Sequence, residues 1–299
     1  MLNKEKSVEI RVNRTKCTRC GICLETCPDY LRPDVDGYPA AKPLAESLFG
    51  CIQCGRCMMK CPSGAIEVRG EDCDASRLRP MPSTLPDFES VRALLLKRRS
   101  IRRFKPDPVP RETIDRILAA AATAPVGLPP SEVKVLVFLG RDKVRALAAE
   151  LSGEMTRLSR MLNPVVLGLM KLFMGGPRFR MIRDFVLPLF KATPKEREKG
   201  RDILFYDAPA VVFFYGAELS GKEDAIIAAA TAVFAAEAAD LGTCFIGTAP
   251  HLFNGSSALK KKYGLLPGEK IAAALILGLP DEACLKTFQR NFKAIRIVD

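Results

Sequence analysis

Apolar residues recur at helical spacing over much of the chain beyond residue 87. They recur every three or four residues over 88–95 and again over 112–123, where Ile114, Ile117 and Leu118 share one face. Both segments therefore predict amphipathic helices. Further helices are predicted over 142–150, 222–241 and 256–263.

Short apolar runs between these helices predict buried strands over 133–139, 209–215, 243–247 and 271–278. Because strands and helices share this part of the chain and 222–241 is rich in alanine, we predict an α+β fold. In it an α/β sandwich forms from a sheet that helices cover. No G-x-G-x-x-G follows the first of these strands, so a dinucleotide-binding Rossmann domain is not expected.

The first 76 residues carry shorter elements. Strand-like runs occupy 8–12 and 65–68, and a short helical piece is predicted over 44–49. Prolines at 80, 82 and 86 indicate an extended linker. We therefore predict a small N-terminal domain at 1–76, a proline-rich linker at 77–87, and a larger domain at 88–299 with a helical insertion at about 151–201.

Two cysteine runs carry the chemistry of the N-terminal part. Both read C-x2-C-x2-C-x3-C-P, and they start at Cys17 and Cys51, 34 residues apart. In this bacterial iron–sulfur pattern three thiolates bind one cubane cluster and the fourth, before proline, binds the other. We therefore predict two [4Fe–4S] clusters with crossed ligands: Cys17, Cys20, Cys23 and Cys61 for one, and Cys51, Cys54, Cys57 and Cys27 for the other.

Zinc and disulfides explain these cysteines less well. Zinc takes four ligands from paired C-x2-C units, which leaves half of each run unused, and disulfide frameworks belong to short secreted chains. The first quarter of the chain resembles bacterial two-cluster ferredoxins, which implies transfer of single electrons at low potential. In the same interpretation Gly21 and Gly55 let backbone N–H groups approach the cluster sulfurs.

The composition favours a cytoplasmic protein. The first ten residues are charged and lack the apolar run of a signal peptide. The longest apolar stretch, 161–174, contains Lys171 and is too short to span a bilayer. Cys73, Cys244 and Cys284 lie outside the two runs and are expected to be free. No nucleic-acid motif accompanies the net charge of +12, so nucleic-acid binding is not expected.

A second candidate site begins at Arg98-Arg99-Ser100. Two guanidiniums and a hydroxyl near a helix end suit a terminal phosphate, although a solvated charge run has the same composition. Later motifs favour the phosphate: Ala-Pro-Val-Gly at 124–127, Leu-Gly-Thr-Cys-Phe-Ile-Gly at 241–247 and Leu-Gly-Leu-Pro at 277–280. With Arg-Arg-Ser-Ile-Arg-Arg-Phe at 98–104, these resemble the FMN-dependent nitroreductase family over about 89–299.

The resemblance implies an FMN site, which in this family usually lies at the interface of an intertwined homodimer. The implied contacts are Arg98, Ser100 and Arg99 at the phosphate, Arg102 at the pyrimidine edge of the ring, Pro125, Val126 and Gly127 along the ring, Ile246, Gly247 and Thr248 near its N5 and O4 edge, and Arg290 over the phosphate. The chain departs from the family at 129–133, where Pro-Pro-Ser-Glu-Val replaces Asn-x-Gln-Pro-Trp, so substrates of better-known members do not transfer.

No protein side chain is named as catalytic, because the family's chemistry takes place at flavin N5. His251, the only histidine, follows the expected flavin loop. It suits a proton donor at neutral pH or a hydrogen-bonded loop residue without a catalytic role.

Residues 151–201 combine a net charge of +7 with a methionine-rich apolar face. Such helices suit a lid over the flavin, an additional dimer contact, or plain packing of an inserted helical pair. Contact with a membrane surface is a further option that the sequence does not favour.

Two functions of different classes are consistent with these features. In the first, an FMN-dependent oxidoreductase passes electrons through two [4Fe–4S] clusters to FMN, which reduces a small organic acceptor such as a nitroaromatic, a quinone or another conjugated compound. The donor is a ferredoxin-like protein or NAD(P)H. In the second, the same cofactors form an electron relay or a flavin-binding sensor module without substrate turnover.

Overall fold

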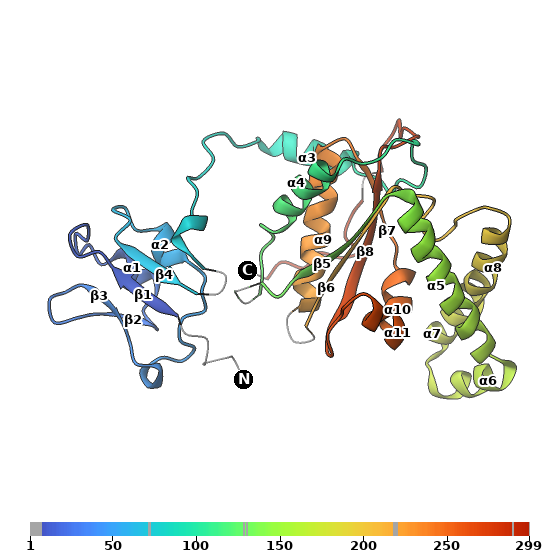
Figure 1. Cartoon of the computed structure of the whole chain (residues 1–299), viewed down its shortest axis with the longest axis horizontal. Helices are drawn as coiled ribbons and strands as arrows, with labels where there is room; N and C mark the ends of the chain where they lie inside the picture. Colours follow the sequence, from blue (N-terminus) through green and yellow to red (C-terminus); the bar gives the residue numbers. More distant parts are fainter. Residues whose placement is uncertain are drawn as a thin grey trace. The chain divides into compact units, whose positions relative to one another are not determined.

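The structure is a computed structural model that describes residues 8–70, 73–127, 129, 131–217, 221–288 and 290–298. The chain divides into two compact units, residues 1–85 with 126–131, and residues 86–125 with 132–299 (Figure 1). Residues 1–7, and positions 128 and 130 just after the Ala-Pro-Val-Gly motif, lie outside the described residues.

The first unit contains two small antiparallel sheets. In one, β1 (Glu9–Val12) pairs with β4 (Ile66–Arg69), and in the other β2 (Leu31–Pro33) pairs with β3 (Pro39–Ala41). Tyr30, Leu31, Met58, Ile66 and Val68 are the larger residues of its core. The helical elements are α1 (Ile22–Thr26), α2 (Arg56–Met59), η1 (Leu44–Glu46) and η2 (Ala75–Arg77).

The second unit is built on a four-stranded sheet of order β5-β6-β8-β7, in which every neighbouring pair is antiparallel. The strands are β5 (Lys134–Leu139), β6 (Ala210–Gly216), β7 (Gly242–Phe245) and β8 (Lys270–Gly278). All four overlap the segments for which the sequence predicts strands, and their ends differ from the predicted ones by at most two residues.

Helices cover both faces of this sheet (Figure 1). Side chains alternate between the faces of a strand, so Leu275 and Leu277 of β8 pack toward α4 and α9 while Ala274 and Ile276 pack with α5 and α10. The predicted α/β sandwich is therefore confirmed. The covering helices are α4 (Arg111–Ala121) and α9 (Gly221–Ala238) on one side, and α5 (Arg141–Met161), α10 (Thr248–Asn254) and α11 (Ser257–Lys262) on the other. α3 (Phe88–Lys97) buries no residue and packs against α9.

The middle of the chain is helical throughout. α5 passes through residue 151 without a break, and α6 (Pro164–Phe173), α7 (Gly176–Met181), a π-helical turn η3 (Ile182–Val186) and α8 (Leu187–Glu198) follow. α5 packs against α8, with Leu151 and Met155 fully buried. α6 lies beyond the end of this helix pair (Figure 1).

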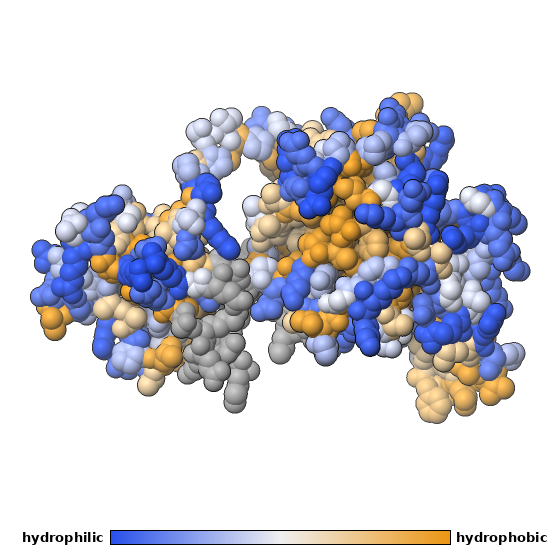
Figure 2. Space-filling model, viewed as in Figure 1, coloured by the Kyte–Doolittle hydropathy of each residue, from blue (hydrophilic) through white to orange (hydrophobic). Residues whose placement is uncertain are grey.

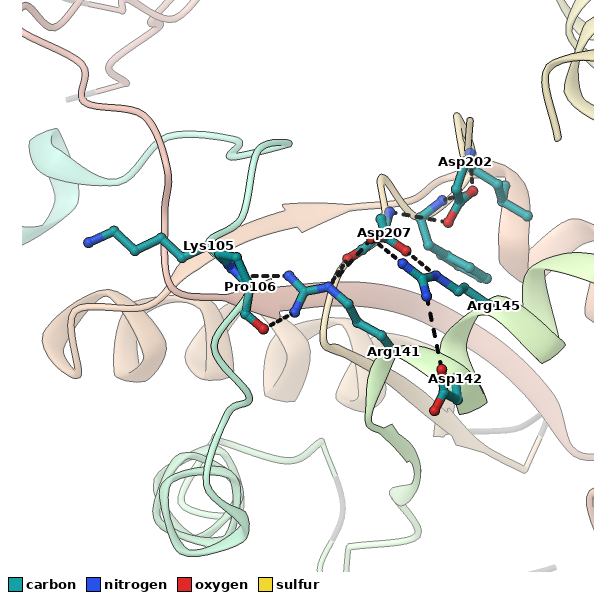
Figure 3. A network of polar contacts seen from close by, with 9 residues as sticks. Lys105, Pro106, Arg141, Asp142, Arg145, Asp202 and Asp207 are labelled. Atoms are coloured by element: carbon teal, nitrogen blue, oxygen red, sulfur yellow. Dashed lines mark hydrogen bonds and ion pairs between the residues drawn. The ribbon is translucent and has the colours of Figure 1, made fainter. Parts of the chain in front are cut away.

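Two arginines of α5 hold the turn before β6 (Figure 3). Asp207 has a left-handed φ of 54°. Its carboxylate accepts hydrogen bonds from Arg145 Nε at 2.6 Å and Nη2 at 2.8 Å, and its backbone oxygen accepts one from Arg141 Nε at 3.0 Å. Arg141 also donates to the carbonyls of residues 105 and 106. The start of α5, the turn and the 105–106 segment are thus tied together.

Candidate functional site

Four cysteines from the two runs line one pocket of the first unit. They are Cys17, Cys20 and Cys23 of the first run and Cys61 of the second. These are the four thiols that the crossed assignment groups. Among the described residues no group of His, Cys, Asp or Glu is placed to hold a single metal ion. A cubane cluster takes one thiolate at each of four corners, and four cysteines line this pocket.

The other four cysteines of the two runs form a second thiol group: Cys27, Cys51, Cys54 and Cys57. Burial is the main cause that raises the pKa of Cys57 to about 12, and the charges of Cys51, Cys27 and Cys54 raise it further. The charges of the other three thiols act on Cys57. These four cysteines are the second ligand set of the crossed assignment. Since each thiol must lose its proton to bind iron, cluster binding here releases protons from Cys51 and Cys57, the two thiols of this set whose pKa burial raises.

The backbone around the cysteines repeats along with the sequence. Arg19 and Gln53, which occupy the same position of the two runs, have left-handed φ of 55° and 57°. Gly21 and Gly55, also equivalent, have φ of 77° and 69° and begin α1 and α2. Left-handed residues in such loops turn successive N–H groups into a concave, anion-binding surface. The loops are therefore shaped for a negatively charged cluster.

Cys61 has polar neighbours of its own. The Ala65 N–H donates to Cys61 Sγ at 3.3 Å, and Ser63 Oγ lies 3.7 Å from the same sulfur. Burial acts to raise the pKa of Cys61, but backbone N–H groups of Ile66 and Ala65 outweigh it and lower the pKa below its usual value. Hydrogen bonds to ligand sulfurs are one of the factors that set a cluster's potential.

In the second unit the flavin-type motifs lie side by side. The Ile101 N–H donates to the oxygen of Thr243 in β7 at 2.9 Å, and the Lys105 N–H donates to the oxygen of Leu279 after β8 at 2.9 Å. Ser100 and Phe104 form isolated bridges with Thr243 and Pro280. In the sequence, segment 98–104 lies more than 130 residues before segments 241–247 and 277–280. The three segments thus meet at the β7 edge of the sheet.

Two glycines make this meeting possible. A Cβ on Gly242 would lie 2.8 Å from three atoms of the Ile101 side chain, and a Cβ on Gly278 would lie 2.6 Å from Phe104 Cδ1. Real Cβ atoms do not approach other atoms this closely. The glycine of each Leu-Gly motif therefore has a packing reason, which the sequence analysis did not identify.

Arg98 and Ser100 line a cavity of about 310 Å³ with Thr243, Cys244 and Phe245 of β7 and residues of α9. Arg99 lines a different cavity, with Glu237, Asp240 and Glu282 among its neighbours. The structure therefore separates Arg99 from the other two expected phosphate contacts. Arg99 Nη1 donates to the oxygen of Arg98 at 2.7 Å, and its Nη2 is buried without a hydrogen-bond partner among the described residues.

Phe245 also borders a larger cavity of about 720 Å³, which Ile246, Gly247 and His251 line as well. The sequence predicts a loop after Gly247, but the structure forms α10, with Thr248 as its first residue and His251 on its exposed side. Asn254 fixes this helix to β8, because its side chain donates to the oxygen of Ile271 and accepts from the Ile271 N–H, both at 2.8 Å.

Arg102 lines neither of these cavities, and its contacts lie outside them. Its guanidinium carbon lies 5.6 Å above the ring centre of Tyr206, and its backbone N–H donates to Glu282 Oε1 at 3.1 Å. Tyr206 precedes Asp207 in the turn that Arg141 and Arg145 hold (Figure 3). The position of Arg102 therefore depends on that network.

Five other expected FMN contacts line neither of the cavities next to Phe245: Pro125, Val126, Gly127, Thr248 and Arg290. Pro125 follows α4 and is exposed, and Arg290 is an exposed residue of the C-terminal segment. Of the remaining expected contacts, Arg98 and Ser100 suit an anionic flavin phosphate, because a guanidinium and a hydroxyl border one cavity.

Known proteins resemble both units. A family model described as the nitroreductase family matches residues 95–279, and a 4Fe-4S dicluster domain model matches residues 16–66. A ferredoxin of Thermococcus litoralis is 34% identical over 61 residues, which cover 20% of this chain and 98% of that ferredoxin.

Solved structures resemble the second unit. A nitroreductase with bound FMN from Bacteroides fragilis NCTC 9343 has 19% identity and a TM-score of 0.50, and the match covers 72% of this chain and 100% of that one. A nitroreductase with bound FMN from Desulfitobacterium hafniense DCB-2 has 20% identity and a TM-score of 0.47, over 72% and 100% of the two chains. The first of these supports the fold.

Proposed function

The chain belongs to the nitroreductase family and carries a ferredoxin-like 4Fe-4S unit, and from this premise we propose that it is an oxidoreductase with two [4Fe–4S] clusters and FMN that reduces an organic acceptor. The observation that carries the proposal is that one chain holds a pocket lined by four cysteines and a cavity lined by Arg98 and Ser100. The acceptor class we propose is a nitroaromatic, a quinone or a similar conjugated compound.

The cofactors, when bound, supply single-electron transfer at the clusters and two-electron reduction at the flavin N5. The chain's own residues bind and orient them. The cluster ligands are the two crossed sets of four cysteines. Arg98 and Ser100 hold the FMN phosphate, since a guanidinium and a hydroxyl offer it several donors.

Other residues of the second unit tune the flavin. Arg102, steadied by Tyr206, places positive charge at the pyrimidine edge of the ring. Gly247 and Thr248 offer backbone N–H groups to its N5 and O4 edge, whereas the N–H of Ile246, the third expected contact there, donates to the oxygen of Ala274 at 2.9 Å. The alanines Ala272–Ala274 of β8 line the 720 Å³ cavity, and their small side chains leave room for a planar acceptor.

We further propose that the protein is a homodimer and that a ferredoxin-like protein or NAD(P)H donates the electrons. Large apolar side chains of the second unit support an interface, because Phe88 is 77% exposed, Leu95 47%, Phe245 46% and Ile226 43%. Light scattering on the purified protein tests this part, and a monomeric mass at micromolar concentration contradicts it.

Anaerobic purification tests the cofactor content. We expect about eight iron and eight sulfide per chain and one FMN. Replacing Arg98 and Ser100 together by alanine should release FMN while iron stays unchanged. Arg103→Ala is the matched control, because its side chain in the same motif is 70% exposed and contacts only Asp281 among the ion pairs described. Protein that refuses FMN after reconstitution contradicts the proposal.

Turnover is tested separately. Protein reduced anaerobically by dithionite should be reoxidised by a panel of nitroaromatics and quinones, followed at the flavin absorption band. FMN that is present but not reoxidised by any acceptor would instead indicate an electron relay or a flavin-binding sensor module.

A further inference from the structure

One helix of the second unit is apolar and uncovered. Lys171 is the only charged or polar residue of α6 (Pro164–Phe173), and none of its ten residues is buried. Side-chain exposure reaches 72% at Val165, 77% at Leu172 and 86% at Phe173. Figure 2 shows apolar side chains gathered at this end of the second unit. A preformed apolar helix without a partner in the described chain needs a surface to cover it.

The helix is presented on a firm base. The Asn163 side chain caps it by accepting the Val166 N–H at 3.0 Å. Directly behind it, α5 packs along α8, and Phe179 of α7 is buried. The apolar helix therefore lies at the end of a packed helical pair and is held outward from the rest of the unit.

The charged residues in and next to this apolar helix are all basic. Residues 155–183 contain six arginines and lysines and no aspartate or glutamate. Arg157 pairs with Glu154 and Arg183 with Asp184, both at the edges of the segment. The four other cations make no ion pair with any residue that the structure describes: Arg160, Lys171, Arg178 and Arg180.

These two properties select the partner. A second copy of this chain would bring the same basic residues against each other in a symmetric contact, which is unfavourable. An anionic lipid surface offers an apolar boundary for Val165, Leu172 and Phe173 together with negative head groups for the cations. None of the described helices is long and apolar enough to cross a membrane, so the contact would be with the surface.

We propose that α6 and the basic residues around it dock the protein on an anionic lipid surface. The helix lies in the plane of the interface, with its apolar side chains among the upper acyl chains and Lys171, Arg178 and Arg180 at the head groups. This proposal does not depend on the cofactors. Its consequence for a reductase is access to acceptors that are dissolved in lipid.

Vesicle sedimentation tests the proposal with the full holoprotein. We expect binding to vesicles of phosphatidylglycerol and phosphatidylcholine in equal parts, weak binding to phosphatidylcholine alone, and release by salt. Changing Lys171, Arg178 and Arg180 to glutamine should weaken binding on the order of a hundredfold. The double change Leu172→Glu and Phe173→Glu should weaken it at least about tenfold.

Leu48→Glu is the matched control for the apolar change, since Leu48 is 76% exposed against 77% for Leu172. It lies in the first unit and should leave vesicle binding unchanged. The protein contains no tryptophan, so Phe173→Trp provides a single fluorophore. Its emission should shift to the blue with anionic vesicles, whereas that of Leu48→Trp should not.

Three outcomes overturn the proposal. The first is no binding to anionic vesicles at low salt. The second is binding that the α6 substitutions leave unchanged. The third is a change in oligomeric mass, or in acceptor reduction without lipid, as the main effect of the Leu172→Glu and Phe173→Glu variant. That third result would identify α6 as a contact between copies or as a lid over the flavin.

Discussion

The two cysteine runs share their spacing and backbone conformation, but the structure surrounds them differently. In the first run Cys20 is exposed and α1 has no buried residue. In the second run Cys57 and Met58 of α2 are buried, with Tyr30 and Cys73 in the same core. Cysteines of equal spacing thus lie in different surroundings, because the packing around the two runs differs.

This difference in burial predicts a difference in reduction potential. Reduction adds negative charge to a cluster that already carries it, and burial disfavours charge. In addition, Ala65 donates to a sulfur of the first set, Cys61. We therefore expect the cluster of Cys17, Cys20, Cys23 and Cys61 to have the higher potential of the two.

The largest effects come from single ligands. Cys61→Ser and Cys20→Ser should remove the same cluster, because the crossed assignment places both ligands in one set, and iron should fall from about eight to about four per chain. Cys27→Ser and Cys57→Ser should remove the other. Electron paramagnetic resonance of the reduced variants identifies which signal is lost.

Cys57→Ser should also lower the thermal midpoint more than Cys20→Ser does. The Cys57 change leaves a hydroxyl in an apolar, buried position, whereas the Cys20 change leaves it in water. Loss of the same signal from Cys61→Ser and Cys57→Ser would contradict the crossed ligand sets.

The two sites differ in how far the sequence reveals them. The cluster ligands lie within two short runs, so their spacing alone predicts which thiols meet. The flavin-type motifs meet only through the sheet, and the sequence places them in order without showing that Ile101 packs on Gly242. It also grouped Arg99 with Arg98, although the two arginines line different cavities.

Elements that packing decides were predicted less well. The helix expected over 142–150 extends to Met161 because Leu151 and Met155 bury against α8. α10 was expected as a loop, and its fixed position depends on the long-range bonds between Asn254 and Ile271. Neither contact leaves a local pattern in the sequence.

Glycines of the second unit also differ in how much space surrounds them. Gly242→Ala forces a methyl group against Ile101, so we expect a loss of about 1–3 kcal/mol of stability, a lower thermal midpoint and weaker FMN retention. Gly153→Ala in α5 is the control, because a Cβ there has no atom within 4 Å. Equal stability of the two variants in thermal unfolding would show that Ile101 relaxes freely.

Gly70→Ala sharpens the comparison within the first unit. A Cβ at Gly70 would meet Gln53 Oε1 at 2.1 Å, and Gln53 is a buried, left-handed residue of the second run. The Gln53 side chain has some freedom to move, so we expect a smaller loss than for Gly242→Ala. The signal of the second cluster should broaden or shift, while that of the first stays in place.

Ser63→Ala should give the smallest effect. The hydroxyl lies 3.7 Å from Cys61 Sγ and is a weaker donor to this sulfur than the Ala65 N–H, which is nearer at 3.3 Å. Removing a donor leaves more negative charge on the sulfur, so the potential of the first cluster should fall, by less than the separation between the two clusters. A potentiometric titration followed by electron paramagnetic resonance measures both. A shift of the second signal alone would assign Cys61 to the buried cluster and reverse the ligand sets.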